Sequence, residues 1–154
     1  MNIDSDQVSQ LLMELGERTP RIESIVQEAG ALRWAIELED GLIVLAELDQ
    51  ERSRLSLETD LGRPAEEHRL ATCEALMMFT FLEHASHDWA MALSEPDGEF
   101  QLCGHVTVAE AGSTDLHSDL FAFIDQAQQW REIVAYGAQL EVAAGEIYSP
   151  TLLA

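Results

Sequence analysis

Apolar residues follow two different periods along this chain, and the changes of period mark its expected elements. Residues 5–15 have the helical period, with apolar side chains three or four positions apart at Val8, Leu11, Leu12 and Leu15. Ser5 is available as the N-cap, and Gly16 with Thr19-Pro20 is expected to end this helix. The weaker helical spacing of residues 20–29 predicts a short helix or an irregular connection.

Three strands are expected next, because the apolar period shortens to two. In residues 33–39, apolar side chains alternate with alanine and glutamate, and the turn sequence Asp40-Gly41 then favours a hairpin. Residues 42–48 are apolar on both faces, and residues 53–60 alternate again. These segments predict a three-stranded antiparallel meander.

The second half of the chain repeats the change from helix to strands. A middle helix is expected from residue 64 to about 84, then strands over 88–94 and 99–108, then a helix over about 114–136 capped by Ser113 or Thr114. The order α-βββ-α-ββ-α predicts an α+β fold, with helices on one face of an antiparallel sheet of about five strands. We expect one domain over residues 1–137 and an apolar tail over 138–154.

The middle helix is apolar around its whole circumference between Leu70 and Leu82. A helix on the outside of a small domain buries one side, and large apolar groups left in water on the other cost about 1.5–3 kcal/mol each. One interpretation is burial within the monomer, and the favoured one is a two-fold homodimer. Its expected interface residues are Leu70, Cys73, Met77, Met78 and Phe81.

Charge excludes several classes of function. The 154 residues carry 29 acidic side chains against 8 basic ones, all arginine, for a formal net charge of −21. Without lysine, Schiff-base and Walker-type chemistry are impossible. The acidic surface argues against nucleic-acid binding, which needs a positive footprint, and against anionic membranes. The acidic surface is expected to keep a protein with exposed apolar side chains soluble.

We expect a cytoplasmic protein, because the sequence has neither a membrane-spanning segment nor a secretory signal. The longest strongly apolar run has eight residues, Ala75 to Leu82, which is too short to insert in a membrane, and the N-terminus does not resemble a secretory signal. Cys73 and Cys103 lie in apolar segments and are expected as buried free thiols in a reducing compartment.

Catalytic patterns give little support for an enzyme, and no metal or cofactor is expected. His84, His87, His105 and His117 leave a small histidine-dependent metal enzyme as one alternative, although no standard ligand spacing is present. A second alternative is an acidic inhibitor that uses its charge to bind a basic partner.

Three segments together resemble a known family. Residues 42–62 are similar to the second hairpin of that family. The segment Pro64-Ala-Glu-Glu, followed by the apolar residues 70–82, is similar to its central helix. Residues 116–131, which end in Trp130-Arg131, are similar to its closing helix. With the element order, size and acidity, the chain resembles the class I type III secretion chaperones, the Tir-chaperone (CesT-like) group, over about residues 5–136.

This resemblance implies a cytoplasmic homodimer without ATPase activity. Such a chaperone binds the N-terminal region of a secreted effector, keeps it non-globular for the export apparatus, and has the secretion ATPase as a further partner. The matching positions for effector binding, by strand addition and side-chain pockets, are Leu11, Leu12, Leu15, Trp34, Ile36, Leu38, Trp89, Met91, Phe100 and Leu102.

Overall fold

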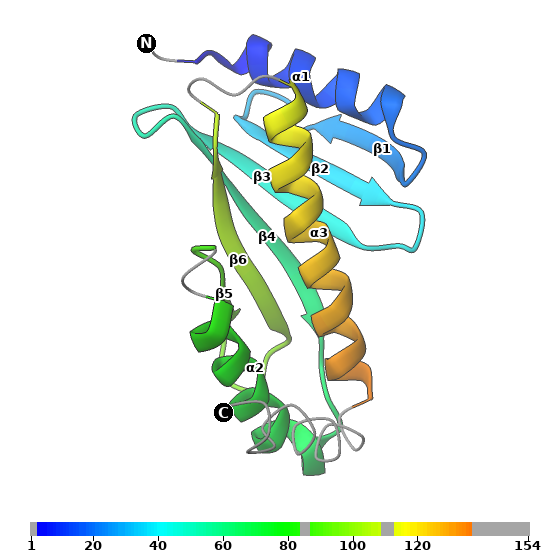
Figure 1. Ribbon diagram of the computed structural model, residues 1–154, viewed down its shortest axis with the longest axis vertical. Coiled ribbons are helices and arrows are strands. Elements are labelled where there is room, and N and C mark those ends of the chain that lie inside the picture. The colour runs from blue at the N-terminus through cyan, green and yellow to red at the C-terminus, as the bar shows by residue number, and fades with distance from the viewer. Residues whose placement is uncertain (1–2, 84–86, 109–112, 137–154) are drawn as a thin grey trace, which may run out of the picture.

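A computed structural model describes residues 3–83, 87–108 and 113–136 (Figure 1). The expected tail, 138–154, and His84 lie outside these residues. The described elements, in chain order, are α1 (Ser5–Arg18), β1 (Ile22–Gln27), β2 (Arg33–Leu38), β3 (Ile43–Asp49), β4 (Arg54–Gly62), the 3-10 helix η1 (Glu66–His68), α2 (Arg69–Glu83), β5 (Ala90–Leu93), β6 (Phe100–Thr107) and α3 (Ser113–Ala135).

The strands form one antiparallel sheet in the order β1-β2-β3-β4-β6-β5. Figure 1 shows α1 and α3 on one face of this sheet, with α1 along β1 and α3 crossing β4 and β6. Helix α2 lies beside the edge strand β5 and touches α3. The α+β class and the order of helices are therefore confirmed, with six strands rather than five.

The additional strand, β1, corrects the expected helix or irregular connection at residues 20–29. It pairs with β2, with Ile25 opposite Ile36 and Val26 opposite Ala35. Without this pairing, β2 would leave a row of backbone donors and acceptors unpaired beside the core. The local apolar spacing was ambiguous because Ile22 is buried while Val26 is exposed.

Helix α1 begins at Ser5 as expected, but its N-cap is one residue earlier, and it continues past Gly16 to end at Arg18, with Thr19 as the C-cap. Asp4 is the N-cap: its carboxylate accepts from the Gln7 backbone N–H at 2.8 Å, and the Gln7 side chain accepts from the Asp4 N–H. Two otherwise orphaned donors are satisfied in this way, so Ser5 is the first helical residue and not the cap. Gly16 lies inside the helix, where its missing side chain leaves room for Ile25.

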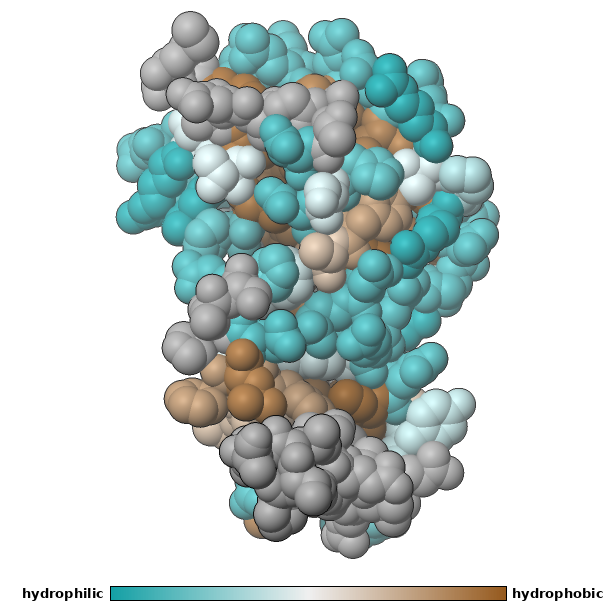
Figure 2. All heavy atoms as spheres, in the orientation of Figure 1, coloured by the Kyte–Doolittle hydropathy of each residue, from teal (hydrophilic) through white to brown (hydrophobic). Residues whose placement is uncertain are grey.

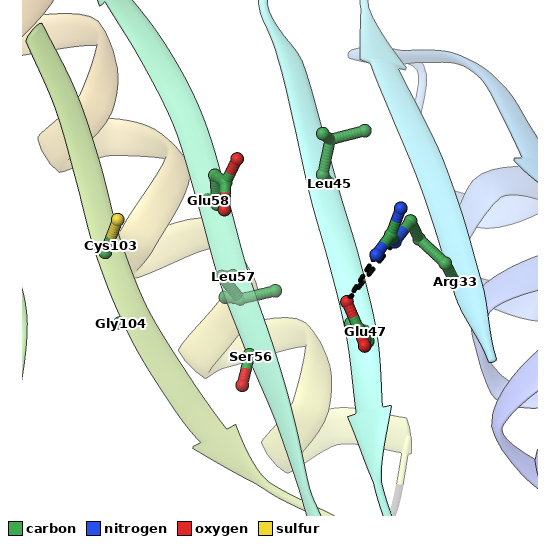
Figure 3. Close-up of a pocket in the computed structure, with 8 residues that line it drawn as sticks. All are labelled: Arg33, Leu45, Glu47, Ser56, Leu57, Glu58, Cys103 and Gly104. Atoms are coloured by element: carbon green, nitrogen blue, oxygen red, sulfur yellow. Dashed lines mark hydrogen bonds and ion pairs between the residues drawn. The ribbon is translucent and has the colours of Figure 1, made fainter. Parts of the chain in front are cut away.

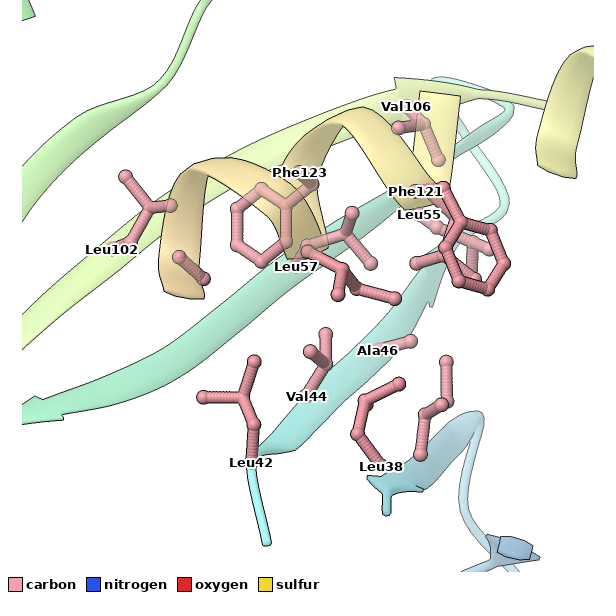
Figure 4. Close-up of a cluster of buried hydrophobic side chains, with 14 of the residues drawn as sticks. Leu38, Leu42, Val44, Ala46, Leu55, Leu57, Leu102, Val106, Phe121 and Phe123 are labelled. Carbon is pink, nitrogen blue, oxygen red and sulfur yellow. The ribbon is translucent and has the colours of Figure 1, made fainter. Parts of the chain in front are cut away.

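The core lies between the sheet and the two helices that cover it (Figure 4). Alternate residues of β2, β3 and β4 point into it, as period-two burial requires. The expected stripe of α3 is buried against them, from Leu116 through Phe123 to Val134. The other face of the sheet, which we call the open face, has neither α1 nor α3 over it, and side chains such as Leu45 and Glu58 point from it.

Candidate functional site

Eight of the ten side chains expected to bind a partner lie in the core. They are each at most 6 % exposed: Leu12, Leu15, Trp34, Ile36, Leu38, Trp89, Phe100 and Leu102. The alternation predicted for the residues of β2 and β6 was correct, but it identified the face of the sheet that α1 and α3 cover. In this structure these eight have almost no surface to offer. Leu11 and Met91 are half-buried and remain partly accessible.

A groove between α1 and β1 has the accessible apolar surface that the buried residues lack. It has a volume of about 310 Å³ and is lined by Met13, Gly16, Glu17, Ile22, Glu23, Ser24 and Ile25. Met13 is 51 % exposed, because it lies off the stripe by which α1 packs. The absence of a side chain at Gly16 brings Ile25 close to the helix backbone. The sequence analysis did not identify this groove; the signal that could have found it is Met13, an apolar residue off the packing stripe, three positions before Gly16.

Among the strands that the structure describes, β1 lies at the edge of the sheet, and the groove borders this edge. The Glu28 N–H donates to the Arg33 carbonyl at 2.9 Å, which makes these two residues a hydrogen-bonded pair. Because such pairs alternate along an antiparallel ladder, the backbone of Val26 points toward β2. The backbones of Ile25 and Gln27 then point outward, while their side chains lie on the α1 side. This edge is ready to pair with another strand.

A second apolar surface covers one side of α2. Leu70 is 72 %, Met77 59 % and Phe81 71 % exposed, and Met78 and Leu82 extend the same surface. We call these five residues the α2 patch; Figure 2 shows apolar side chains gathered in the region of α2. The opposite side of the helix, with Thr72, Ala75 and Leu76, is buried. Four of the five residues expected at a dimer interface are thus exposed, and Cys73 is half-buried beside them.

The described histidines are divided between separate contacts. His87 stacks on Trp89 with ring centroids 3.9 Å apart, and His117 packs against Phe121 on α3 at 4.6 Å. His105 Nε2 lies 3.6 Å from a carboxylate oxygen of Asp88. Among residues 3–83, 87–108 and 113–136, no group of three or more His, Cys, Asp or Glu side chains is placed to hold a metal ion. These contacts give the alternative of a metal enzyme no support.

Polar contacts hold α3 against the turn between β2 and β3, where Asp40 lies. Gln128 Nε2 donates to Asp40 Oδ2 at 2.9 Å, and Arg131 donates to the same oxygen at 3.3 Å. Arg21 donates to Gln128 and to Asp125 at 2.8 and 3.0 Å. The β1 side of the groove and the β1 edge follow Arg21 directly in the chain. The network therefore holds the start of β1 in place against α3.

Comparison with known proteins identifies relatives of this fold. The family model for the Tir chaperone protein (CesT) family matches residues 10–131. A chain of the ExsC-ExsE complex is similar, with a TM-score of 0.67 and 22 % identity over 88 % of this chain and 98 % of that one. A chain of the HopA1-SchA chaperone-effector complex has a TM-score of 0.61 and 15 % identity, over 84 % and 98 % respectively.

Two other results complete the comparison. A search of curated protein sequences found no match. Within the described part of the chain, none of the helices combines the length and apolar character that crossing a membrane requires.

Proposed function

This chain belongs to the Tir chaperone protein (CesT) family, and on that premise we propose that it is a type III secretion chaperone. It binds the N-terminal chaperone-binding region of an effector protein, keeps that region soluble and non-globular, and promotes its delivery to the export apparatus. The observation that carries the proposal is the family match over residues 10–131, joined to an apolar groove beside a free strand edge. The chaperone-effector complex among the similar structures supports the same class of partner.

Strand addition at β1 explains how the effector is held. The outward backbones of Ile25 and Gln27 supply main-chain hydrogen bonds to an extended segment without reading its sequence. Alternate side chains of that segment then enter the groove lined by Met13, Gly16 and Ile25. Such a segment gains its hydrogen bonds from the chaperone and therefore does not need to fold on its own.

The α2 patch is the proposed homodimer interface. Leaving Leu70, Met77 and Phe81 in water is costly, and a two-fold contact covers them on both copies at once. The patch lies beside β5, at the opposite edge of the sheet from β1. Dimerisation therefore leaves both β1 edges accessible. We further propose a cytoplasmic location, the secretion ATPase as a later partner, and no catalytic activity.

Capture of a client from the native host tests this function. The tagged full chain is used as bait, the bound proteins are identified by mass spectrometry, and each is then co-expressed with the chain to measure its solubility. We expect a secreted protein, bound through its N-terminal region. Gln27→Pro removes an outward N–H from the β1 edge and should lose most of the client. Gln27→Ala keeps this N–H and is the matched control.

Two results would contradict the proposal. One is recovery of no secreted protein by the folded wild-type chain. The other is equal client capture by Gln27→Pro and Gln27→Ala, with both variants shown to be folded by circular dichroism, since strand addition requires the main-chain donor that proline lacks.

A further inference from the structure

The middle of the open face is hollow. The hollow has a volume of about 330 Å³ and is lined by Arg33, Leu45, Glu47, Ser56, Leu57, Glu58, Cys103 and Gly104, from four neighbouring strands (Figure 3). It is separated from the groove at α1 by the sheet itself. Cys103 and Gly104 on β6 line one side, Leu45 and Glu47 on β3 line the other, and Ser56 and Glu58 on β4 lie between them.

A continuous row of side chains crosses this face from edge to edge. The strand registers place Val26, Ala35, Leu45, Glu58, Cys103 and Ala90 side by side. Leu45 is 39 % exposed and Val26 is 60 % exposed. The row is therefore apolar, apart from the carboxylate of Glu58. It begins on β1, the strand whose free edge we propose for the client.

The charges on this face are unbalanced. Arg33 donates to Glu47 at 2.9 Å and lies 3.5 Å from Glu28, and the charge of Glu58 acts on it most weakly of the three, so the guanidinium is shared among three carboxylates. Arg54 lies 3.6 Å from Asp49. Within the described residues, neither arginine forms an ion pair with Glu58. Glu58, beside the exposed Leu45, therefore shares one cation with two closer carboxylates and can form a close ion pair with a cation supplied from outside.

We propose that the open face binds a second extended stretch of the client chain, which places an arginine or lysine side chain at Glu58 and an aliphatic side chain against Leu45. This inference rests on the proposed chaperone function. Charge complementarity favours a basic occupant, because the chain carries a net charge of −21. Glu47 and Glu58 disfavour a second copy on this face, since two acidic faces would repel one another, whereas the α2 patch has no charged residue. A client leaving the β1 edge reaches this face directly at Val26.

A short synthetic peptide that alternates arginine and valine tests the proposal on the full-length protein. Its affinity is measured by fluorescence anisotropy at physiological salt, and its position by the amide shifts of isotope-labelled protein. We expect the shifts to centre on Leu45, Glu58 and Cys103. Glu58→Gln and Leu45→Thr should each raise the dissociation constant about threefold, the effect of losing one exposed contact. A glutamate-valine peptide should not bind.

The matched control is Asp119→Asn, which removes the same charge from an exposed position of α3 on the other side of the sheet. Equal weakening by Asp119→Asn and Glu58→Gln would mean that the peptide senses net charge alone, which would overturn the proposal. So would shifts centred on the α2 patch or the α1 groove. Open-face shifts that depend on protein concentration without peptide would assign the face to a second copy. Peptide-induced shifts shared with residues 138–154 would assign it to the chain's own tail.

The two proposals fail separately. Gln27→Pro should remove most client capture and leave the arginine-valine peptide bound at the open face, because binding there does not use the β1 edge. If the client is captured but the peptide does not bind the open face, the chaperone function stands and this inference falls. If the peptide binds but the folded chain captures no secreted protein, the chaperone function falls and this inference, which rests on it, falls as well.

Discussion

The indole of Trp89 occupies the space that a side chain at Gly104 would need. A Cβ at position 104 would lie 2.9 Å from Nε1 and 3.0 Å from Cγ of the ring. The ring also meets Phe123 of α3 edge-on, at 5.5 Å between centroids, and His87 stacks on it. Trp89 thus joins β6, α3 and the start of β5, and glycine is required at 104 because the space is already filled.

Gly104→Ala should destabilise the protein by about 1–3 kcal/mol, the usual cost of overpacking a core. The added methyl group forces the indole away from Phe123. The urea midpoint, followed by tryptophan fluorescence and circular dichroism, measures the loss. Trp89→Phe provides the control: adding Gly104→Ala to it should cost less than adding Gly104→Ala to the wild type, since the smaller ring leaves room. Equal costs in the two backgrounds would contradict the packing argument.

Two exposed methionines should separate dimerisation from client binding. Met77→Glu puts a charge in the α2 patch and should convert the dimer to a monomer at low micromolar concentration, as measured by analytical ultracentrifugation. Met13→Glu makes the same change in the α1 groove, where it should preserve the dimer and reduce client capture. Both side chains are more than half exposed, so neither change disturbs the core. A wild-type monomer, or loss of the dimer in Met13→Glu, would refute this division.

Asp40 should stabilise the fold less as the pH falls. Burial tends to raise the pKa of its carboxyl, but hydrogen bonds from the Leu42 N–H and Gln128, together with the charge of Arg131, more than offset this and hold the pKa below its usual value of 3.8. A lowered pKa contributes stability above the unfolded-state value, and this contribution is lost as the pH falls through the folded-state value.

Comparison of the wild type with Asp40→Asn checks this dependence. At neutral pH the variant should unfold at a lower urea concentration, because asparagine brings no charge to Arg131. The difference should shrink as the pH is lowered below about 3.8, where the carboxyl of the unfolded chain becomes protonated, and should be lost below the lower pKa of the folded state. A difference that stayed constant from pH 7 to pH 2 would show that Asp40 acts without its charge.

Cys103 should react slowly as a nucleophile. Burial, together with the nearby carboxylate of Glu58, raises the pKa of its thiol, so less thiolate is present at pH 8. Alkylation by iodoacetamide, located by peptide mass spectrometry, should lag behind that of a free thiol. Glu58→Gln removes the electrostatic contribution and should speed alkylation, whereas Asp119→Asn should not. Unchanged reactivity in Glu58→Gln would place Glu58 too far from the thiol to affect it.

The local pattern of apolar residues predicted most helices and strands, but it did not predict which of their faces are exposed. The alternation of Trp34, Ile36 and Leu38 identified β2, and the turn Asp40-Gly41 was confirmed, with Gly41 at a φ of +85°. The same alternation could not show whether these side chains meet a partner or α1 and α3. Residues 42–48 posed the related question of which apolar face is covered, and Val44 proved buried while Ile43 proved exposed.

The sequence by itself determined the α+β class, the order of helices and the surplus of apolar residues on α2, because these depend on periods within a dozen neighbouring residues. Tertiary structure alone decided that residues 22–27 become a strand, since β1 exists through its pairing with β2. It also decided which side of the sheet is core, because α3 lies on β4 from more than fifty positions away in the chain. Burial depends on such distant contacts, and no local pattern records them.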